Sequence, residues 1–227
     1  MAFSHNPRIV TGDSLVLCID AADKVSYPGV GTTWSDLSNN GHTGTLTGDP
    51  TFNSNYGGTI EFDGSGDYIS FPDSSDWNIG TADFAIEQWI NVDSTGSQAL
   101  FNHWQSSNVD LRTIHHPSLG LLLYVNNTVY PSNGQGSVTL TANAWHHIVF
   151  TRVASTLNYY LDKSVVATQA NFTTNIQDYS GALEIGRTEQ SGMYDGEIAI
   201  TRFYVGKGLS QEEVNQNFNA QRGRFGV

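Results

Sequence analysis

Short apolar segments that alternate every second residue run through most of this chain, separated by turns rich in Gly, Asn and Ser. In Phe84–Val92 the even-numbered positions are mostly apolar, and Leu183 and Ile185 also lie two residues apart. Strand residues have this period when every second side chain enters a core. The pattern predicts an all-β fold in which no helix separates the strands.

The spacing of the apolar residues changes from a strand-like to a helix-like period only near the C-terminus. Ser210 and Glu213 have the spacing of a capping box, and Val214 and Phe218 form a short apolar stripe behind it. A cation followed by glycine is typical of a helix end, so Gly223 is the expected stop. We therefore expect one short C-terminal helix.

Length and charge limit the classes of protein. The chain has 227 residues, which favours one domain, with an N-terminal extension at 1–14 and the helix and tail at 209–227. The formal net charge of −12 excludes nucleic-acid binding through phosphate neutralisation. No apolar run is long enough to span a bilayer, so no membrane insertion is expected.

Two features bear on the compartment. The first ten residues lack the apolar stretch of a secretory signal, so no signal peptide is expected. Cys18 is the one cysteine and lies in an apolar run, which predicts a buried, unreactive thiol.

The order of the predicted strands indicates two antiparallel sheets packed as a jelly-roll sandwich. Residues 60–71 (IEFD-GSG-DYISF) have the pattern of a hairpin with a glycine-rich turn. Further strands are predicted at 98–104, 110–115, 119–126, 137–141, 145–152, 157–162 and 165–169, with the last four forming a meander.

A long polar segment follows the first strand. It extends from residue 21 to about residue 58 and is rich in Gly, Asn, Ser and Thr. Connections of this length are usually functional or held by their own side chains. The residues expected to hold it are Tyr27, Trp34, Leu37 and Phe52.

Several segments, in this order, resemble a laminin-G-like domain of the concanavalin A-like lectin/glucanase superfamily. They are IEFDGSGDYISF with FAIEQWINV, NAWHHIVFTR with LNYYLDKSVVAT, and LEIGR with YDGEIAITRFY and LSQEEV. The resemblance extends from about Leu15 to the C-terminus and implies a concanavalin A-like sandwich. The superfamily contains lectins, hydrolases, adhesion modules and spacers, so the resemblance alone does not give the function.

Two short segments also resemble parts of tailed-phage structural proteins. They are Trp34–Ser38 followed by Asn40-Gly41, and the C-terminal RGRFG. This likeness implies a protein of the virion, assembled in the host cytoplasm, with neighbouring virion proteins as partners.

The residues do not favour glycoside hydrolysis, which requires two carboxylates at one bond. Glucan-cleaving relatives of this fold carry a Glu-x-Asp-x-x-Glu strand, and the chain has no such run. Glu87 and Glu184 stand on predicted strands, but each is the one glutamate in its segment. We therefore expect no enzyme activity.

Calcium is the candidate cofactor, because it prefers carboxylate and carbonyl oxygens. Asp63 and Asp67 flank a Gly-Ser-Gly turn, and Asp195 precedes Gly196. The alternative is that these aspartates accept hydrogen bonds from turn amides. His146 and His147 point to opposite faces of a strand, so they cannot chelate one ion together.

A glycan site requires an aromatic face for the sugar ring and fixed polar groups for its hydroxyls. Aromatic and polar residues of this kind cluster in the central strands, which are expected to form the concave sheet. The candidates are His103, Trp104, Arg112, His115, Tyr124, Asn126 and Tyr130. The alternative is that the aromatic residues belong to the core. If His115 lies at a strand end, it lines a site with His103.

Three functions remain open. The leading hypothesis is a non-enzymatic module on a phage particle that binds a glycan or polysaccharide of the host surface, with homo-oligomers as one option. The alternative is an architectural capsid or tail decoration protein without a sugar ligand. A divergent hydrolase would require two carboxylates that face each other across the concave sheet.

Overall fold

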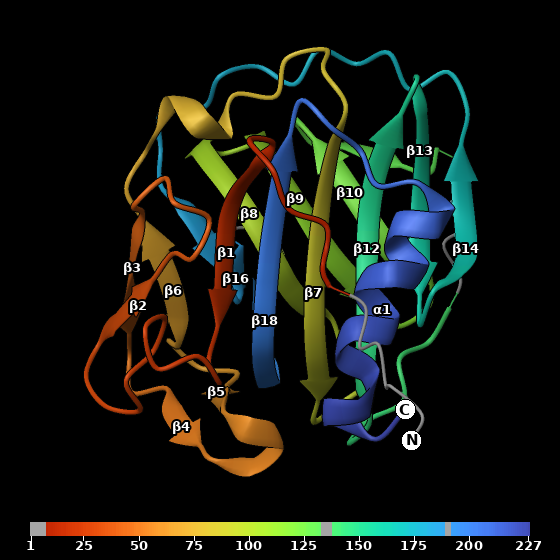
Figure 1. The fold of residues 1–227 in the computed structure, drawn as a ribbon. Coiled ribbons are helices and arrows are strands. Elements are labelled where there is room, and N and C mark those ends of the chain that lie inside the picture. Colours follow the sequence, from red (N-terminus) through yellow and green to blue (C-terminus); the bar gives the residue numbers. More distant parts are fainter. Residues whose placement is uncertain (1–7, 133–137, 189–191) are drawn as a thin grey trace.

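Two antiparallel β-sheets packed face to face form the body of the protein (Figure 1). The structure is a computed structural model, and it describes residues 8–132, 138–188 and 192–227. The predicted all-β sandwich with one C-terminal helix is confirmed.

Sheet A is centred on β18, the longest strand. One edge of β18 pairs with β7, and its other edge is shared by β5 and β1. In spatial order the strands are β14 (Ser164–Gln169), β13 (Thr156–Leu161), β12 (Trp145–Val153), β7 (Phe84–Val92), β18 (Asp195–Val205), β5 (Thr59–Asp63) and β4 (Thr51–Asn53), with β1 (Leu15–Asp20) beside β18.

Sheet B contains the central strands of the sequence. Its spatial order is β11 (Thr128–Tyr130), β10 (Gly120–Val125), β9 (Val109–His116), β8 (Gln98–Ser106), β15 (Leu183–Ile185), β6 (Tyr68–Phe71), β3 (Thr43–Thr47) and β2 (Thr33–Ser35). A small ribbon, β16 (Arg187–Thr188) with β17 (Gly192–Met193), follows β15.

The core lies between the two sheets and is formed by alternate residues of each strand. Ile86 and Phe150 enter it from sheet A, and Phe101, Leu123 and Leu183 enter it from sheet B; each is at most 1% exposed. Burying one such side chain contributes about 1.5–3 kcal/mol. The residues between them therefore point away from the core.

The predicted hairpin at residues 60–71 is wrong. β5 pairs with β18 and β4 in sheet A, whereas β6 pairs with β15 and β3 in sheet B. The chain crosses from one sheet to the other through Gly64 and Gly66, whose φ angles are 75° and 91°. The two segments have the alternation of paired strands because both put Ile and Phe into the same core from opposite sides.

The predicted strand at 137–141 is also wrong over the residues that the structure describes there, 138–141, while residue 137 lies outside them. Leu140 is fully buried although it lies in a loop, and its N–H donates to His115 Nε2 at 3.4 Å. The rest of the predicted meander, β12–β13–β14, is confirmed.

The long segment after β1 contains three short strands, β2, β3 and β4, that the sequence did not reveal. Trp34 is fully buried, and its indole N–H donates to Ser26 Oγ at 3.1 Å. The Tyr27 ring lies 6.0 Å from that of Trp34 and 5.6 Å from that of Phe52. Leu37 packs against a second apolar cluster, so the predicted holding role of these side chains is confirmed.

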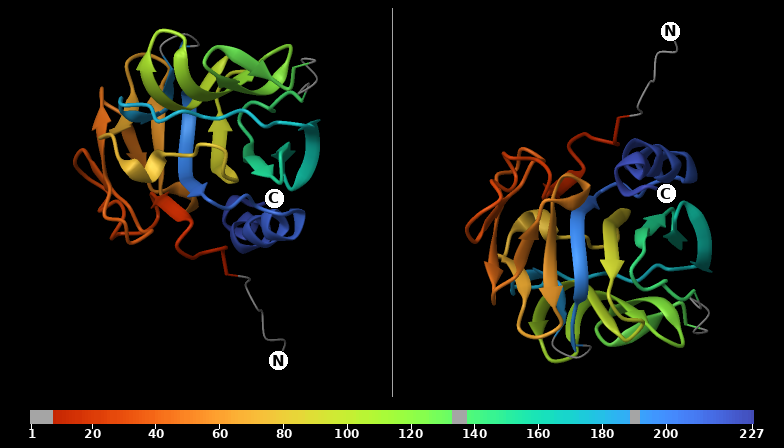
Figure 2. Two further views of the ribbon diagram at one scale, coloured as in Figure 1. Left: turned by 90° about the horizontal axis from the view of Figure 1, so that it is seen from above. Right: turned by 90° about the horizontal axis from the view of Figure 1, so that it is seen from below.

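Helix α1 (Gln211–Phe225) covers the face of sheet A that points away from sheet B, as the views along the sandwich show (Figure 2). The capping box of Ser210 and Glu213 is present. The predicted stop at Gly223 is wrong, because the helix continues to Phe225 and ends at Gly226, whose φ is 74°.

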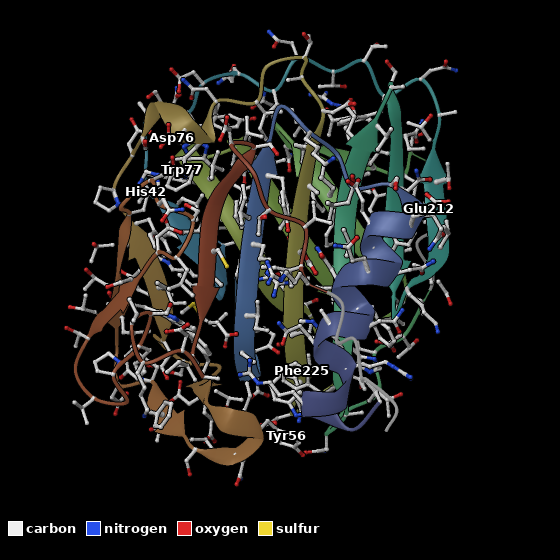
Figure 3. The ribbon with its side chains drawn as sticks, in the orientation of Figure 1. His42, Tyr56, Asp76, Trp77, Glu212 and Phe225 are labelled. Carbon is white, nitrogen blue, oxygen red and sulfur yellow. The ribbon has the colours of Figure 1, made fainter. Side chains whose placement is uncertain are left out.

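Aromatic packing explains why the helix continues. The Phe225 ring stacks 4.4 Å from Trp89 and lies 4.5 Å from Trp145, both on sheet A. Tyr56 packs on its other side, with ring centroids 6.2 Å apart (Figure 3). These aromatic contacts stabilise the last part of the helix, although Gly223 by itself would favour an earlier end.

A charged network lies buried between α1 and sheet A. Glu87 accepts hydrogen bonds from Arg202 (3.0 Å) and from Asn217 of α1 (2.8 Å), and it pairs with His147 at 2.7 Å. Burial opposes ionisation, but these partners outweigh it and hold the pKa of Glu87 at about 2. His147 faces α1, whereas Ile148 faces the core. His146 lies two residues before Ile148 and therefore shares its face, so the prediction that His146 and His147 point to opposite faces is confirmed.

Cys18 lies on β1 and is 5% exposed. Burial is the largest influence on its thiol and raises the pKa. The prediction of a buried, unreactive cysteine agrees with this environment.

Candidate ligand-binding surface on sheet B

One row of side chains crosses sheet B on the face that points away from the core. The chain neighbours of these residues, such as Phe101, Leu123 and Leu183, belong to the core, so the row faces outward. Strand register places six residues side by side in the row: Tyr124, Arg112, Asn102, Glu184, Ser70 and Thr45. We call this row the sheet B row.

Arg112 organises one end of the sheet B row. Its Nη1 contacts both carboxylate oxygens of Asp110, at 2.8 and 2.7 Å, and its Nη2 donates to Asn127 Oδ1 at 3.0 Å. The guanidinium also lies over the Tyr124 ring, 4.2 Å from the centroid. Stacking and pairing together fix the plane of the arginine.

A similar arrangement occurs on the other side of Asn102. Arg187 of β16 pairs with Glu184 at 3.5 Å, and its guanidinium lies 4.7 Å from the centroid of the Tyr68 ring. Two arginines, each stacked on a tyrosine and paired with a carboxylate, therefore flank the middle of the row.

Asn102 lies in the middle of the sheet B row, on β8, which stands between β9 and β15. Its side chain is fully buried, and neither Oδ1 nor Nδ2 has a hydrogen-bond partner among the described residues. Trp104, two residues further along the same face, is half-buried, and its indole N–H also lacks a partner there. Leaving such groups unpaired costs about 1–3 kcal/mol each.

Three of the seven predicted ligand-binding residues lie on this surface: Trp104, Arg112 and Tyr124. Tyr124 and Arg112 are direct cross-strand neighbours, and Trp104 is the cross-strand neighbour of Asp110. The predicted grouping is correct for these three residues, and whether they bind a ligand stays a prediction.

His103 does not belong to the surface, because it points into the core. Its ring meets the Tyr179 ring edge-on with centroids 5.3 Å apart, and its Nε2 lies 3.6 Å from Asp73. Burial lowers the pKa of His103, which favours the neutral ring.

His115 points to the same interior side. Its Nδ1 lies 3.3 Å from the carbonyl oxygen of Gly96, and its Nε2 accepts from the N–H of Leu140. Burial lowers its pKa as well. Both histidines point to the core side of sheet B, since their cross-strand partners Leu183 and Leu121 lie in the core, so the predicted site between them is wrong.

Asn126 and Tyr130 have structural contacts instead. Asn126 lies in the turn between β10 and β11, and its Oδ1 accepts from Tyr179 Oη at 3.1 Å. Tyr130 Oη is 2.9 Å from Thr174 Oγ1, and its ring packs on Phe172. Neither residue lies in the sheet B row.

Sequence reasoning missed Asn102, Asp110 and Glu184 as members of this surface. Alternation along each strand indicates which residues face outward, because residues two apart share a face. However, one irregularity in the register between Ala99 and Phe101 changes the face of part of β8. Alternation alone therefore could not assign the outward residues.

The predicted metal residues are only partly brought together. Carboxylate oxygens of Asp49, Asp63 and Asp67 lie within 4.8 Å of one another. They line a pocket of about 180 Å³ together with Thr51 and Glu61. Asp49 was missed because it lies in the loop before β4, far from the glycine turn in sequence.

The chemistry of this group fits calcium in part. Carboxylate oxygens are suitable ligands. However, Asp67 is buried and already accepts the N–H groups of Asp49 (2.9 Å) and Asp63 (3.2 Å). For Asp67 the alternative, a role in fixing the turn, is thus confirmed. These two hydrogen bonds leave fewer lone pairs on the Asp67 carboxylate for an ion.

Asp195 is not part of that group of carboxylates. It pairs with Asp63 through the backbone, and its N–H donates to Gln98 Oε1 at 2.8 Å. Its carboxylate lies close enough to Asp93 to add to the effect of burial in raising the pKa of Asp93. The prediction that Asp195 shares a metal site with Asp63 and Asp67 is not supported by this geometry.

A polar contact outside both sites holds the edge of the sandwich. His42 Nε2 lies 2.8 Å from Asp76 Oδ2, and the His42 ring packs 4.2 Å from Trp77 (Figure 3). Trp77 is itself 1% exposed. This group joins the start of β3 to the turn after β6 and is structural.

Within the described residues, no helix is both long and apolar enough to cross a lipid bilayer.

Solved structures with the same fold are numerous. Domain 4 of AbnA, a GH43 extracellular arabinanase from Geobacillus stearothermophilus solved with arabinotriose, superposes with a TM-score of 0.73 at 17% identity, covering 92% of this chain and 98% of that domain. The binding domain of Paraclostridial Mosquitocidal Protein 1 gives a TM-score of 0.69 at 17% identity. The botulinum neurotoxin serotype D binding domain with N-acetylneuraminic acid gives 0.65 at 15%.

This chain spans about half the length of the two toxin binding domains, 52% and 51%, while 92% of it is covered in each case. Identities this low show a shared fold. No curated protein sequence matches the chain at a significant level.

Residues 63–215, more than half of the chain, match the sequence profile of a laminin-G family described as the Concanavalin A-like lectin/glucanases superfamily. The two antiparallel sheets and the fold of the arabinanase domain agree with that match. The chain therefore belongs to the concanavalin A-like lectin/glucanases superfamily.

Proposed function

We propose that this protein is a non-enzymatic carbohydrate-binding module whose ligand lies on the outer face of sheet B. The observation that carries the proposal is the sheet B row, in which Arg112 lies between Tyr124 and Asn102, with Trp104 on the same face. Aromatic rings can pack on the apolar face of a sugar, and the Asn102 amide and Trp104 indole, which lack partners among the described residues, can bind its hydroxyls.

The structural neighbours support this proposal. One is described in complex with arabinotriose, and another in complex with N-acetylneuraminic acid. The neighbours show that the fold presents saccharide sites in other proteins, although low identity transfers no residue roles.

The carboxylates on this face favour binding over hydrolysis. Asp110 and Glu184 both point outward, as a divergent hydrolase would require. However, each is held by an arginine, Arg112 and Arg187 respectively. In a glycosidase the two carboxyl groups flank one glycosidic bond, and one of them gives its proton to the leaving oxygen. Burial raises the pKa of Asp110, while the pairing with Arg112 acts in the opposite direction.

Calcium binding at Asp49, Asp63 and Asp67 belongs to the proposal as a separate, structural site. The three carboxylates converge beside the crossing from β5 to β6. An ion there would reduce repulsion between them and fix the crossing, without contact to the sheet B row.

The proposed setting is the exterior of a phage particle. It is supported by the likeness of Trp34–Ser38 and the C-terminal RGRFG to phage structural proteins. In this setting the ligand is a glycan or polysaccharide of the host surface, and neighbouring virion proteins or further copies of the chain are partners. Immunogold labelling of phage particles with antibody against this chain tests the setting.

A glycan array tests the binding function. The array is probed with the wild-type protein, Tyr124→Ala and Trp104→Ala, with and without calcium. The control is Val165→Ala, which changes an exposed side chain on β14 of the other sheet. We expect a wild-type signal that both sheet B variants lose and the control keeps.

The outcomes separate the hypotheses. Signal in wild type and in both sheet B variants places the site elsewhere. The absence of any signal, together with concentration-dependent self-association in light scattering, supports the architectural alternative. Release of reducing sugar from a bound glycan contradicts the non-enzymatic assignment.

A further inference from the structure

Asn102 lies in the middle of the proposed site, and its surroundings bear on the class of saccharide. The residue is fully buried on the ligand-facing side of sheet B, and its amide lacks a hydrogen-bond partner within the described chain. An amide that presents one acceptor and two donors matches a neutral hydroxyl, which both donates and accepts. A carboxylate can only accept.

Charge on the two sides of Asn102 argues against an anionic ligand. Arg112 is neutralised by Asp110, with contacts of 2.7 and 2.8 Å, and Arg187 pairs with Glu184. An acidic sugar would have to displace one of these carboxylates to bind its arginine. The net charge of −12 adds long-range repulsion against polyanions.

The stacking of both arginines supports the same conclusion. Each guanidinium lies on a tyrosine ring, Arg112 on Tyr124 and Arg187 on Tyr68. These contacts hold the arginines in place as parts of a rigid, internally neutral surface. Such a surface can recognise hydroxyls without offering a free charge.

We propose, on the basis of the proposed function, that the ligand is an uncharged saccharide and that Asn102 is the residue that hydrogen-bonds its hydroxyls, between the two arginine–carboxylate pairs. Since no part of Asn102 is exposed, a neighbouring side chain on this face moves when the saccharide reaches the amide.

The experiment compares neutral with acidic saccharides by isothermal titration calorimetry. The neutral probes are arabinotriose, cellohexaose and maltohexaose, and the acidic probes are 3′-sialyllactose and oligogalacturonate. Each is titrated into the wild type, Asn102→Ala and Asn102→Ser. The matched control is Asn91→Ala on β7 of the other sheet, which replaces another asparagine whose buried Oδ1 has no partner among residues 8–132, 138–188 and 192–227.

We expect the wild type to bind at least one neutral probe and no acidic probe. Asn102→Ala should weaken that binding about tenfold or more, as loss of hydrogen bonds to uncharged groups predicts, and Asn102→Ser should restore part of it. Asn91→Ala should bind as the wild type does. Thermal unfolding provides an independent readout. Because the Asn102 amide has no hydrogen-bond partner in the described part of the chain, Asn102→Ala should not lower the melting temperature by more than a few degrees.

The other outcomes are distinguishable. Binding of acidic probes alone overturns the neutral-ligand inference and leaves the carbohydrate-binding function intact. Neutral binding that Asn102→Ala does not change overturns the role of Asn102. Binding of none of the probes counts against both this inference and, together with an empty glycan array, the proposed function itself.

Discussion

Glu87 of β7 and Arg202 of β18 form an ion pair 3.0 Å apart that is sealed beneath helix α1, and neither side chain is more than 1% exposed. Asn217 of α1 donates to the second carboxylate oxygen of Glu87, so the pair ties the helix to sheet A. This relationship keeps the outer face of sheet A covered by α1, on the side opposite to the face of sheet B where we propose the ligand.

Replacing Glu87 by Gln should strongly destabilise the protein, because Arg202 would keep its charge in a buried site without a counter-ion. Breaking a buried pair on one side typically costs about 3–5 kcal/mol. Urea unfolding at pH 7, followed by tryptophan fluorescence, measures this loss. A loss below about 1 kcal/mol would mean that the pair contributes little.

Glu87 should also make the free energy of unfolding depend on pH. The folded pKa of Glu87 is about 2, below its ordinary value of 4.5. Its contribution to stability is therefore complete above about pH 4.5 and is lost as the pH falls toward 2. The loss is on the order of 3 kcal/mol at about 1.4 kcal/mol per pKa unit.

The measurement is the difference in unfolding free energy between wild type and Glu87→Gln at pH 6, 5, 4 and 3. This difference should shrink as the pH falls below 4.5. A difference that stays constant over this range contradicts the lowered pKa.

The helix cap offers a second test of stability. Ser210 Oγ accepts the N–H of Glu213, and the Glu213 carboxylate accepts the N–H of Ser210. Ser210→Ala should lower the free energy of unfolding by roughly 0.5–2 kcal/mol. Asn219→Ala, an exposed change on the same helix, is a suitable control, and equal effects of both variants would refute the capping role.

Calcium should raise the melting temperature if the group of Asp49, Asp63 and Asp67 holds the ion. Stabilisation grows with free calcium, reaching about 2.7 kcal/mol at a hundredfold excess over the dissociation constant. Asp49→Asn should remove the shift without disturbing the turn that Asp67 fixes. Asp13→Asn, an exposed change outside the group, should keep it.

An unchanged melting temperature of the wild type in millimolar calcium would rule out the ion at this group. The carboxylates would then serve the turn alone, as the two amide contacts of Asp67 already indicate.

The sequence allowed the fold to be predicted wherever alternation and local signals agreed. The capping box at Ser210 and the meander β12–β13–β14 are examples. It failed where long-range contacts decide the outcome. Gly223 has the character of a helix end, but the packing of Phe225 on Trp89 extends the helix beyond it.

The same limit applies to the site. Trp104, Arg112 and Tyr124 were predicted together because they lie in neighbouring strands, and the register confirms that they share a face. His103 and His115 could not be separated from them by residue type, since only the pairing of His103 with Leu183 shows that it points inward. The residue type of Asn102 could not single it out, because its interest comes from hydrogen bonds that its side chain does not make with the described residues.

The most direct test of the central claim is nuclear magnetic resonance of ¹⁵N-labelled protein titrated with arabinotriose, or with the neutral saccharide that binds best in calorimetry. If the saccharide binds on sheet B, the resonances of the Asn102 side-chain amide and the Trp104 indole N–H should shift most, while those of the Trp89 and Trp145 indoles beneath α1 should not shift. Shifts confined to the α1 face or to the loop of Asp49, Asp63 and Asp67 would contradict a saccharide site on sheet B.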